Sequence, residues 1–509
     1  MWFVLVSIFV TRFCYHNKKI TQDNHNRRVT MTQVQLSPCK NYIGQIQPLE
    51  DSIALNIFQN PHNTLYRSFQ VIEIIQSKFV PNNIPSSLDI SFQWEYNYKG
   101  KDCEKLAVLV RNMAALFFLD INKYEASSVL IRQPQYEGIE SFQWLPPTDH
   151  EKKTGYANSS QIVLFSELNL SANIYSLDCT RRLFTIDKPI NDRIIYRRTS
   201  SGSFWCMLAD TFEYNVPPTM YQFSNLRSFS LLMNSARLHN FVSEEVRVDW
   251  SPSGNWLQIL DQNEALSGHN LKVYGSNGTS GPNFAKPLVD IEFESEVEED
   301  GLVRIARGGI HNCWCSIDSE EFILLARLVG DQLELKGVSM KLLKVVLRAT
   351  KDLKEIVAQS NVRDDSIDVM RVLQLHELIF VQLGKFMLCL FHRTGDAELN
   401  FLTAVETQSD IVDIIANKSR WFIITKQQIL LYEKSLVKAL LSTNIPIYSA
   451  SLLDKDTIVV FSRGPDGEFW NYLNIEESSQ NSKARGTSSN HSTDEITDTF
   501  AIRKRARIQ

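Results

Sequence analysis

The chain has 509 residues, of which 43% are hydrophobic and 22% charged, as in an ordinary folded globular protein. Its formal net charge is -5 and its pI is near 6.1, so overall charge attracts it neither to nucleic acid nor to an anionic membrane, and we predict neither as a partner. Eight cysteines are too few for a disulfide scaffold, which predicts reduced thiols in an intracellular protein.

The first 30 residues differ from the rest of the chain. An apolar run, Met1 to Val10, precedes a polar and basic stretch, Thr11 to Arg28. The run is too short for a transmembrane helix, which needs about 20 residues. It also lacks the basic start and the small-residue cleavage site of a signal peptide. We interpret residues 1–30 as a non-native or disordered extension with the working start at Met31. A membrane tether through the apolar run is the alternative.

From Met31 onward, short segments alternate apolar and polar residues with the period of half-buried strands, and the strands come in groups. The first group has a strand, a Ser-Pro turn and an aromatic restart over Val34 to Ile43. Later groups begin at Ile90, Ile139, Asp187, Val246, Cys313, Val369, Leu399 and Ile447. The group from Asp187 is the weakest, with strands predicted at Ser203 to Leu208 and Met220 to Phe223.

The clearest group spans Val246 to Tyr274. Apolar and charged residues alternate up to Trp250. Ser251-Pro252-Ser253-Gly254 then turns the chain, because proline lacks a ladder donor and glycine favours turns. Strands at Trp256 to Leu260 and Leu271 to Tyr274 follow. This succession of strand, turn, strand, loop and strand is typical of the inner part of a propeller blade.

Two insertions interrupt the groups, at residues 146–160 and 279–309. The second holds the acidic run Glu292 to Asp300, which we interpret as a solvated loop; a landing site for a basic partner is the alternative. Lys341 to Leu347 is predicted as a strand, and Lys351 to Ser360 has helical spacing. Residues 476–509 are polar and predict a disordered tail with the basic end Arg503 to Arg507.

About nine groups occupy residues 31–475, at a spacing near the ~40–45 residues of WD repeats. One blade cannot bury both of its faces alone, so neighbouring blades must stack and close a ring. We therefore predict an all-β, WD-repeat-like β-propeller of about seven to nine degenerate blades. Because rings usually hold about four to eight blades, either one group is over-split or two rings lie in tandem.

Aromatic residues recur at one place in this pattern. A tryptophan ends the first strand of four groups, at Trp94, Trp144, Trp250 and Trp314. That regularity favours packing in the core over exposure to a partner. Three further tryptophans fall at less regular positions and are candidates for partner contact: Trp256, Trp421 and Trp470.

Motifs that would carry chemistry are weak. His311-Asn312-Cys313-Trp314-Cys315 looks like a metal-binding cluster, but a closed zinc site needs four ligands and no second pair has suitable spacing. Cys313 and Cys315 face the same side of a strand, as packing residues do. The glycines between Gly268 and Gly281 lack nucleotide-binding spacing, and Gly100-Lys101 lacks the upstream glycine of a phosphate loop. We predict no catalytic, cofactor or metal site, no small-molecule substrate and no enzyme activity.

The order of the groups resembles the WRAP-type WD-repeat family of animal centrosomes and fungal spindle pole bodies. The resemblance covers Thr32 to Leu473 by order and spacing. It rests on Val248 to Gly254 with Leu271 to Gly278, on Trp314 to Ala326 with Gly330-Asp331, and on Leu36 to Ile43. The chain departs from the family pattern because it has no Trp-Asp dipeptide, the nearest remnants being Leu119-Asp120 and Leu177-Asp178.

The resemblance implies a non-catalytic scaffold at the spindle pole body or centrosome that anchors microtubule minus ends and organises the mitotic spindle. Its implied partners are a coiled-coil anchoring protein and a minus-end-directed kinesin of the kinesin-14 class. The implied location is the cytoskeleton of the cytoplasm. The alternative is a WD-repeat scaffold of another intracellular complex, in RNA processing or vesicle traffic, with Arg503 to Arg507 acting as a nuclear import signal.

Overall fold

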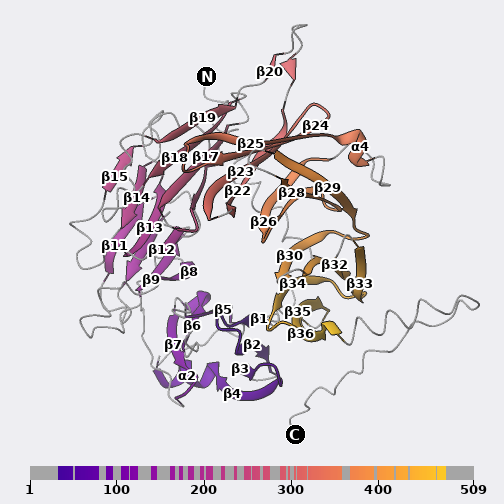
Figure 1. Cartoon of the computed structure of the whole chain (residues 1–509). Coiled ribbons are helices and arrows are strands. Elements are labelled where there is room, and N and C mark those ends of the chain that lie inside the picture. The colour runs from indigo at the N-terminus through magenta and orange to yellow at the C-terminus, as the bar shows by residue number, and fades with distance from the viewer. Residues whose placement is uncertain are drawn as a thin grey trace, which may run out of the picture. The chain divides into compact units, whose positions relative to one another are not determined.

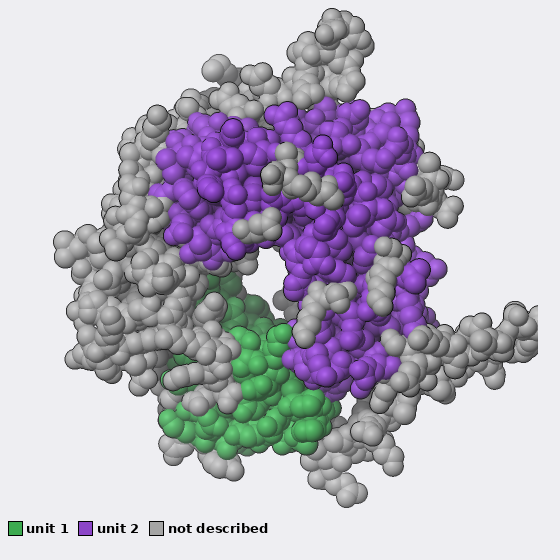
Figure 2. Space-filling view, in the orientation of Figure 1, with its two compact units in different colours: residues 1–192 green, residues 193–509 purple. Residues whose placement is uncertain are grey.

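Antiparallel sheets in which consecutive strands pair in chain order make up the computed structural model (Figure 1). The structure describes residues 33–476 with gaps. The gaps are residues 50–51, 79–87, 96–104, 114, 124–138, 146–160, 167–170, 176–181, 188–194, 200–201, 210–218, 224–233, 238–245, 254, 264–267, 276–286, 294–295, 298–302, 305, 318, 358–366, 395–397, 418–419, 434–435 and 466. The chain divides into two compact units, residues 1–192 and 193–509 (Figure 2).

The described part of the first unit contains three sheets. The first consists of β1 (Gln33–Leu36), β2 (Tyr42–Pro48), β3 (Ile53–Gln59) and β4 (Thr64–Gln70), and α2 (Val71–Lys78) follows it. The second consists of β5 (Ile90–Trp94), β6 (Lys105–Val110) and β7 (Ala115–Asp120), with the 3-10 turn η1 (Arg111–Met113) between the last two. The third consists of β8 (Ile139–Leu145), β9 (Gln161–Ser166), β10 (Ser171–Tyr175) and β11 (Arg182–Asp187).

The second unit continues the pattern. Its first two sheets consist of β12 (Ile195–Thr199), β13 (Gly202–Ala209), β14 (Thr219–Phe223) and β15 (Asn234–Arg237), then β16 (Val246–Trp250), β17 (Trp256–Asn263), β18 (Gly268–Gly275) and β19 (Val289–Phe293). A short hairpin of β20 (Glu296–Val297) and β21 (Val303–Arg304) comes next.

Four more groups of consecutive strands complete the described part of this unit, the first two of them within one eight-stranded sheet. The first consists of β22 (Ala306–Ile317), β23 (Glu320–Val329), β24 (Gln332–Ser339) and β25 (Lys344–Asp352), and α4 (Leu353–Val357) follows it. The second consists of β26 (Val369–Leu375), β27 (Leu378–Leu383), β28 (Met387–Thr394) and β29 (Glu398–Glu406). The third consists of β30 (Ile411–Asn417), β31 (Arg420–Thr425), β32 (Gln428–Glu433) and β33 (Leu436–Ser442), and the last of β34 (Ile447–Leu452), β35 (Thr457–Gly464) and β36 (Gly467–Asn474). A single parallel pair, Arg348 with Glu398, joins β25 to β29.

This strand order is that of propeller blades, so the all-β, WD-repeat-like propeller fold predicted from the sequence is confirmed. The described residues form nine such groups of three or four strands, three in the first unit and six in the second, of which β22–β25 and β26–β29 are joined in one eight-stranded sheet; this is roughly the predicted number of blades. Within the second unit the first strands of neighbouring blades lie side by side, as β22 does with β26 and β30 with β34. The number of rings remains a prediction.

Within each unit, described neighbouring blades share apolar cores, as the blades β22–β25, β26–β29 and β30–β33 do. In β27, Ile379 and Val381 join the cluster formed with the preceding blade, whereas Leu378 and Phe380 join the cluster formed with the following blade. Alternate side chains of a strand point to opposite faces, so a strand buried on both faces must be apolar throughout. This is why β27 reads Leu-Ile-Phe-Val-Gln-Leu and is buried along its whole length.

Several predicted elements differ in detail. The segment predicted as an insertion at 279–309 contains β19, the fourth strand of its blade, and the start of β22. The strand predicted from Lys341 begins three residues later, because residues 340–343 form a turn. The predicted helix over Lys351 to Ser360 begins two residues later than predicted, at Leu353 of α4, since β25 continues to Asp352; residues 358–360 lie outside the described residues. The extension at residues 1–30, the insertion at 146–160 and the basic run Arg503 to Arg507 lie outside the described residues.

The two described α-helices are α2 and α4, and neither is long and apolar enough to cross a membrane.

Candidate interaction surface

Serines close the turns between the first and second strands of two blades. The Ser37 hydroxyl accepts the Tyr42 N–H at 3.0 Å, and the Ser251 hydroxyl accepts the Trp256 N–H at 3.2 Å. In both turns the backbone N–H of the serine also donates to the carbonyl of the same partner residue. Both serines are fully buried. The Ser-Pro motif is therefore a structural turn, and it marks one end of the sheets, which we name the Ser-Pro end.

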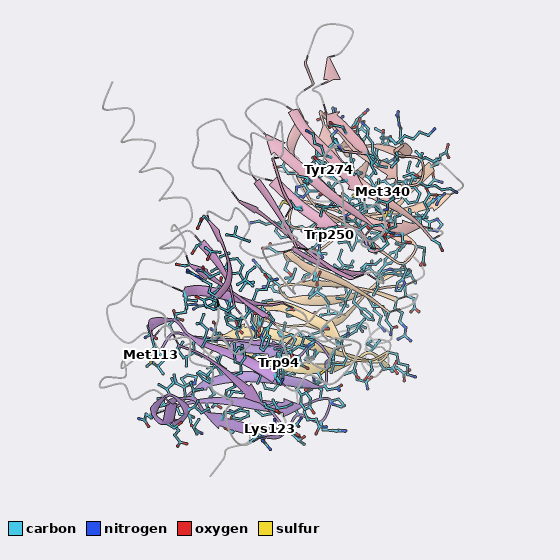
Figure 3. All side chains as sticks on the ribbon, turned by 90° about the vertical axis from the view of Figure 1, so that its left-hand side faces the viewer. Trp94, Met113, Lys123, Trp250, Tyr274 and Met340 are labelled. Carbon is cyan, nitrogen blue, oxygen red and sulfur yellow. The ribbon has the colours of Figure 1, made fainter. Side chains whose placement is uncertain are left out.

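Three of the strand-ending tryptophans connect their blade to the one before it. The indole N–H of Trp94 donates to the Gln35 carbonyl at 3.2 Å, and that of Trp144 donates to the Gln93 carbonyl at 3.3 Å. Trp314 repeats this bond in the second unit, with the Asp249 carbonyl at 3.4 Å. The predicted packing role is confirmed for Trp94, Trp144 and Trp250, which are buried, whereas Trp314 is half-buried and packs against a core cluster; Figure 3 labels Trp94 and Trp250. Sequence spacing did not predict the hydrogen bonds.

The cysteine pair is part of the core. Cys315 is buried and Cys313 half-buried, and both pack into the cluster that joins the β22–β25 blade to the β26–β29 blade. Desolvation raises the pKa of the Cys313 thiol to about 12 and also raises that of Cys315. A protonated, buried thiol is neither a metal ligand nor a nucleophile at neutral pH. Among the described residues no group of three metal-ligating side chains comes together.

Buried charge occurs at one place in the same blade. Arg327, which is 6% exposed, donates to the Glu334 carboxylate at 2.9 Å, and Lys336 lies 3.2 Å from the same carboxylate. Burial disfavours the charged carboxylate, but the two cations outweigh it and hold the pKa of Glu334 below its ordinary value. Because Arg327 and Glu334 are directly paired across β23 and β24, we interpret this cluster as structural.

The turn between β24 and β25 exposes apolar side chains. Its residues Lys341, Leu342, Leu343 and Lys344 are all exposed, with Leu342 at 55% and Leu343 at 38%. Leu343 has φ 53°, in the left-handed region that glycine and asparagine usually occupy. In the first blade the residue at the same place, Asn63 before β4, has φ 52°. A leucine therefore stands where the backbone favours asparagine.

Hydrogen bonds fix this turn. The fully buried Ser339 hydroxyl donates to the Glu320 carboxylate and accepts the Leu342 N–H at 3.0 Å. The Ser339 carbonyl accepts the Leu343 N–H at 2.8 Å. The two leucines are thus held outward by the backbone rather than by contacts of their own side chains.

The same end of the preceding blade adds a third exposed leucine. Leu288, 48% exposed, comes directly before β19, as Leu343 comes directly before β25. Gly275 makes room for it: a Cβ there would lie 2.3 Å from Leu288 and 2.9 Å from Trp256. Trp256 is half-buried and packs on the cluster that contains Met340 (Figure 3). We call Leu288 and residues 341–344 the turn patch.

A contact between the two blades supports the patch. The Glu321 carboxylate accepts the Ser253 N–H and the Ser253 hydroxyl, both at 2.7 Å, and so ties the Ser-Pro turn of one blade to β23 of the next. The Glu321 carbonyl accepts the Met340 N–H at 3.0 Å.

Of the three irregular tryptophans, Trp421 is buried and donates to the Leu375 carbonyl, whereas Trp256 and Trp470 are half-buried.

Comparisons with known proteins find similar solved structures but no related sequence. No family model and no curated protein matches the sequence. Among solved structures, Saccharomyces cerevisiae Sqt1 is similar at 8% identity and TM-score 0.43, over 73% of this chain and 93% of that one. The Dos1 propeller is similar at 10% identity and TM-score 0.42, over 73% and 89%. With TM-scores below 0.5, neither likeness bears on what this chain binds.

Proposed function

We propose that this chain is a non-catalytic protein-interaction scaffold of the spindle pole body or centrosome, where it helps to anchor microtubule minus ends. The observation that carries the scaffold role is the turn patch: three exposed leucines on a hydrogen-bonded framework. Exposed apolar residues held rigidly are typical of sites that bind other proteins, since little ordering entropy is lost on binding.

The spindle-pole assignment is supported by the resemblance to the WRAP-type family. Two of the three stretches that carry the resemblance, those from Val248 and from Trp314, lie in the β16–β19 and β22–β25 blades. These are also the blades that carry the turn patch. On this proposal the partners are a coiled-coil anchoring protein and a minus-end-directed kinesin.

Two measurements test the proposal. A fluorescent fusion should mark the spindle poles throughout mitosis, and affinity purification from mitotic cells should recover a coiled-coil protein together with a kinesin. Diffuse signal, or recovery of RNA-processing or vesicle-traffic components instead, would refute the spindle role. Deletion of residues 503–507 separates the alternatives, because only a scaffold that depends on nuclear import should change its location.

A further inference from the structure

We infer that the turn patch binds an acidic amphipathic helix of a partner protein. This inference rests on the scaffold role proposed above and names the chemistry of one partner segment. Its starting point is the backbone of Leu343. A bulky residue at φ 53° is strained, and such strain persists where the surrounding structure enforces it and a function uses it. Asn63 shows that the same turn position elsewhere in the chain has the residue that relieves the strain.

The positive charge of the patch favours a negatively charged partner segment. Lys341 and Lys344 flank the two leucines and are exposed, and neither forms a described ion pair. The neighbouring carboxylates of Glu320 and Glu321 are engaged, by Ser339 and by Ser253 respectively. An apolar surface between two lysines is complementary to an apolar stripe with Asp or Glu on both sides.

The shape of the patch favours a helix. Leu342 and Leu343 project from one turn, and Leu288 lies at the corresponding end of the neighbouring blade. Leucines presented in this way fit between the residues at positions i, i+3, i+4 and i+7 of an amphipathic helix. A second copy of this chain is a poor occupant, because a two-fold contact would bring the lysines of both copies together.

A membrane is the less favoured ligand. Two leucines at a turn tip bury little apolar surface in a bilayer. A helix can instead cover the leucines from several sides and pair with both lysines.

The test uses the purified full chain and a labelled helical peptide of about 20 residues, with leucines at i, i+3, i+4 and i+7 and glutamates on both flanks. Fluorescence anisotropy should show saturable binding. Leu342→Ser with Leu343→Asn should weaken binding by about tenfold or more. Asparagine suits the backbone at position 343, so the Leu343→Asn single variant should have an unfolding temperature equal to or above that of the wild type. Weaker peptide binding by this variant would therefore not be caused by a loss of folding.

Matched controls make the result specific. Leu402→Ser and Leu436→Ser, which change exposed leucines of β29 and β33, should bind the peptide as the wild type does. Lys341→Glu with Lys344→Glu should lose the glutamate-flanked peptide and gain a lysine-flanked one. Equal binding by wild type and patch variants would overturn the inference, as would binding to vesicles with about a quarter phosphatidylserine but not to the peptide. None of these readouts depends on location in the cell, so the spindle-pole proposal can fail while this one stands.

Discussion

Gly44 of the first blade faces Phe92 of the second, and its replacement by alanine tests how tightly the two blades pack. A Cβ at Gly44 would lie 2.6 Å from Cε2 of Phe92, a distance at which the ring must move. Phe92 is fully buried in the shared core, so it has little freedom to do so. Overpacking of this kind costs about 1–3 kcal/mol, and the lower chain entropy of alanine in the unfolded state returns about 0.4–1 kcal/mol.

The expected net effect is therefore a destabilisation of about 1–2 kcal/mol. Urea unfolding followed by tryptophan fluorescence is a suitable assay, since Trp94 also lies within 3.4 Å of the added Cβ. The midpoint should fall by about 0.5 M with an unchanged slope. Gly464→Ala is the matched control, because the nearest atom there is 3.3 Å away and we expect a near-neutral effect.

A second substitution tests the cause. Leucine at position 92 lacks the ring atoms that the new Cβ would meet, so Phe92→Leu should compensate for Gly44→Ala. The double variant should be more stable than the sum of the single effects predicts, by about 0.5–2 kcal/mol. An unchanged or raised midpoint for Gly44→Ala, or strict additivity with Phe92→Leu, would refute the packing argument.

Three further predictions concern single interactions. Trp144→Phe keeps most of the packing but removes the hydrogen bond to the Gln93 carbonyl, so the protein should lose about 1–2 kcal/mol of stability in chemical unfolding. Ser251→Ala leaves the Trp256 N–H without its serine hydroxyl and should cost about 1 kcal/mol, whereas Ser253→Ala changes an exposed contact and should cost less. Glu334 has a lowered pKa, so its stabilising effect is present above the ordinary carboxyl pKa and is lost as pH falls through the lowered value. The stability difference between wild type and Glu334→Gln should therefore be largest near neutral pH and should shrink on acidification. A difference that grows in acid would contradict the ion cluster.

The blades could be predicted from the sequence because the residues that signal each strand and turn lie close together in the chain. Alternation up to Trp250, the Ser-Pro turn and the restart at Trp256 all lie within a few residues of one another, and each reflects which side of a strand is buried. The same holds for the strand-ending tryptophans, whose burial follows from their position. Their hydrogen bonds do not follow in this way, because donor and acceptor lie 51 to 65 residues apart in different blades.

The turn patch was also not predicted, and here the reason is the local residue types rather than distance along the chain. Leu342 and Leu343 are apolar, so period alone extends the following strand back to Lys341. Left-handed turn positions are normally recognised by glycine or asparagine, and Leu343 removes that signal. The short fourth strand β19 was missed because it follows a long polar stretch and consists of only five residues.

The direction of the tryptophan bonds has a consequence for synthesis of the chain. In each described case the donor belongs to the later blade and the acceptor carbonyl to the earlier one. A chain that emerges from the ribosome with its N-terminus first therefore presents each acceptor before the matching indole is made. A blade with such a tryptophan can dock onto a preceding blade that is already folded. Assembly can then proceed one blade at a time, because the acceptor carbonyl is in place when the indole is made.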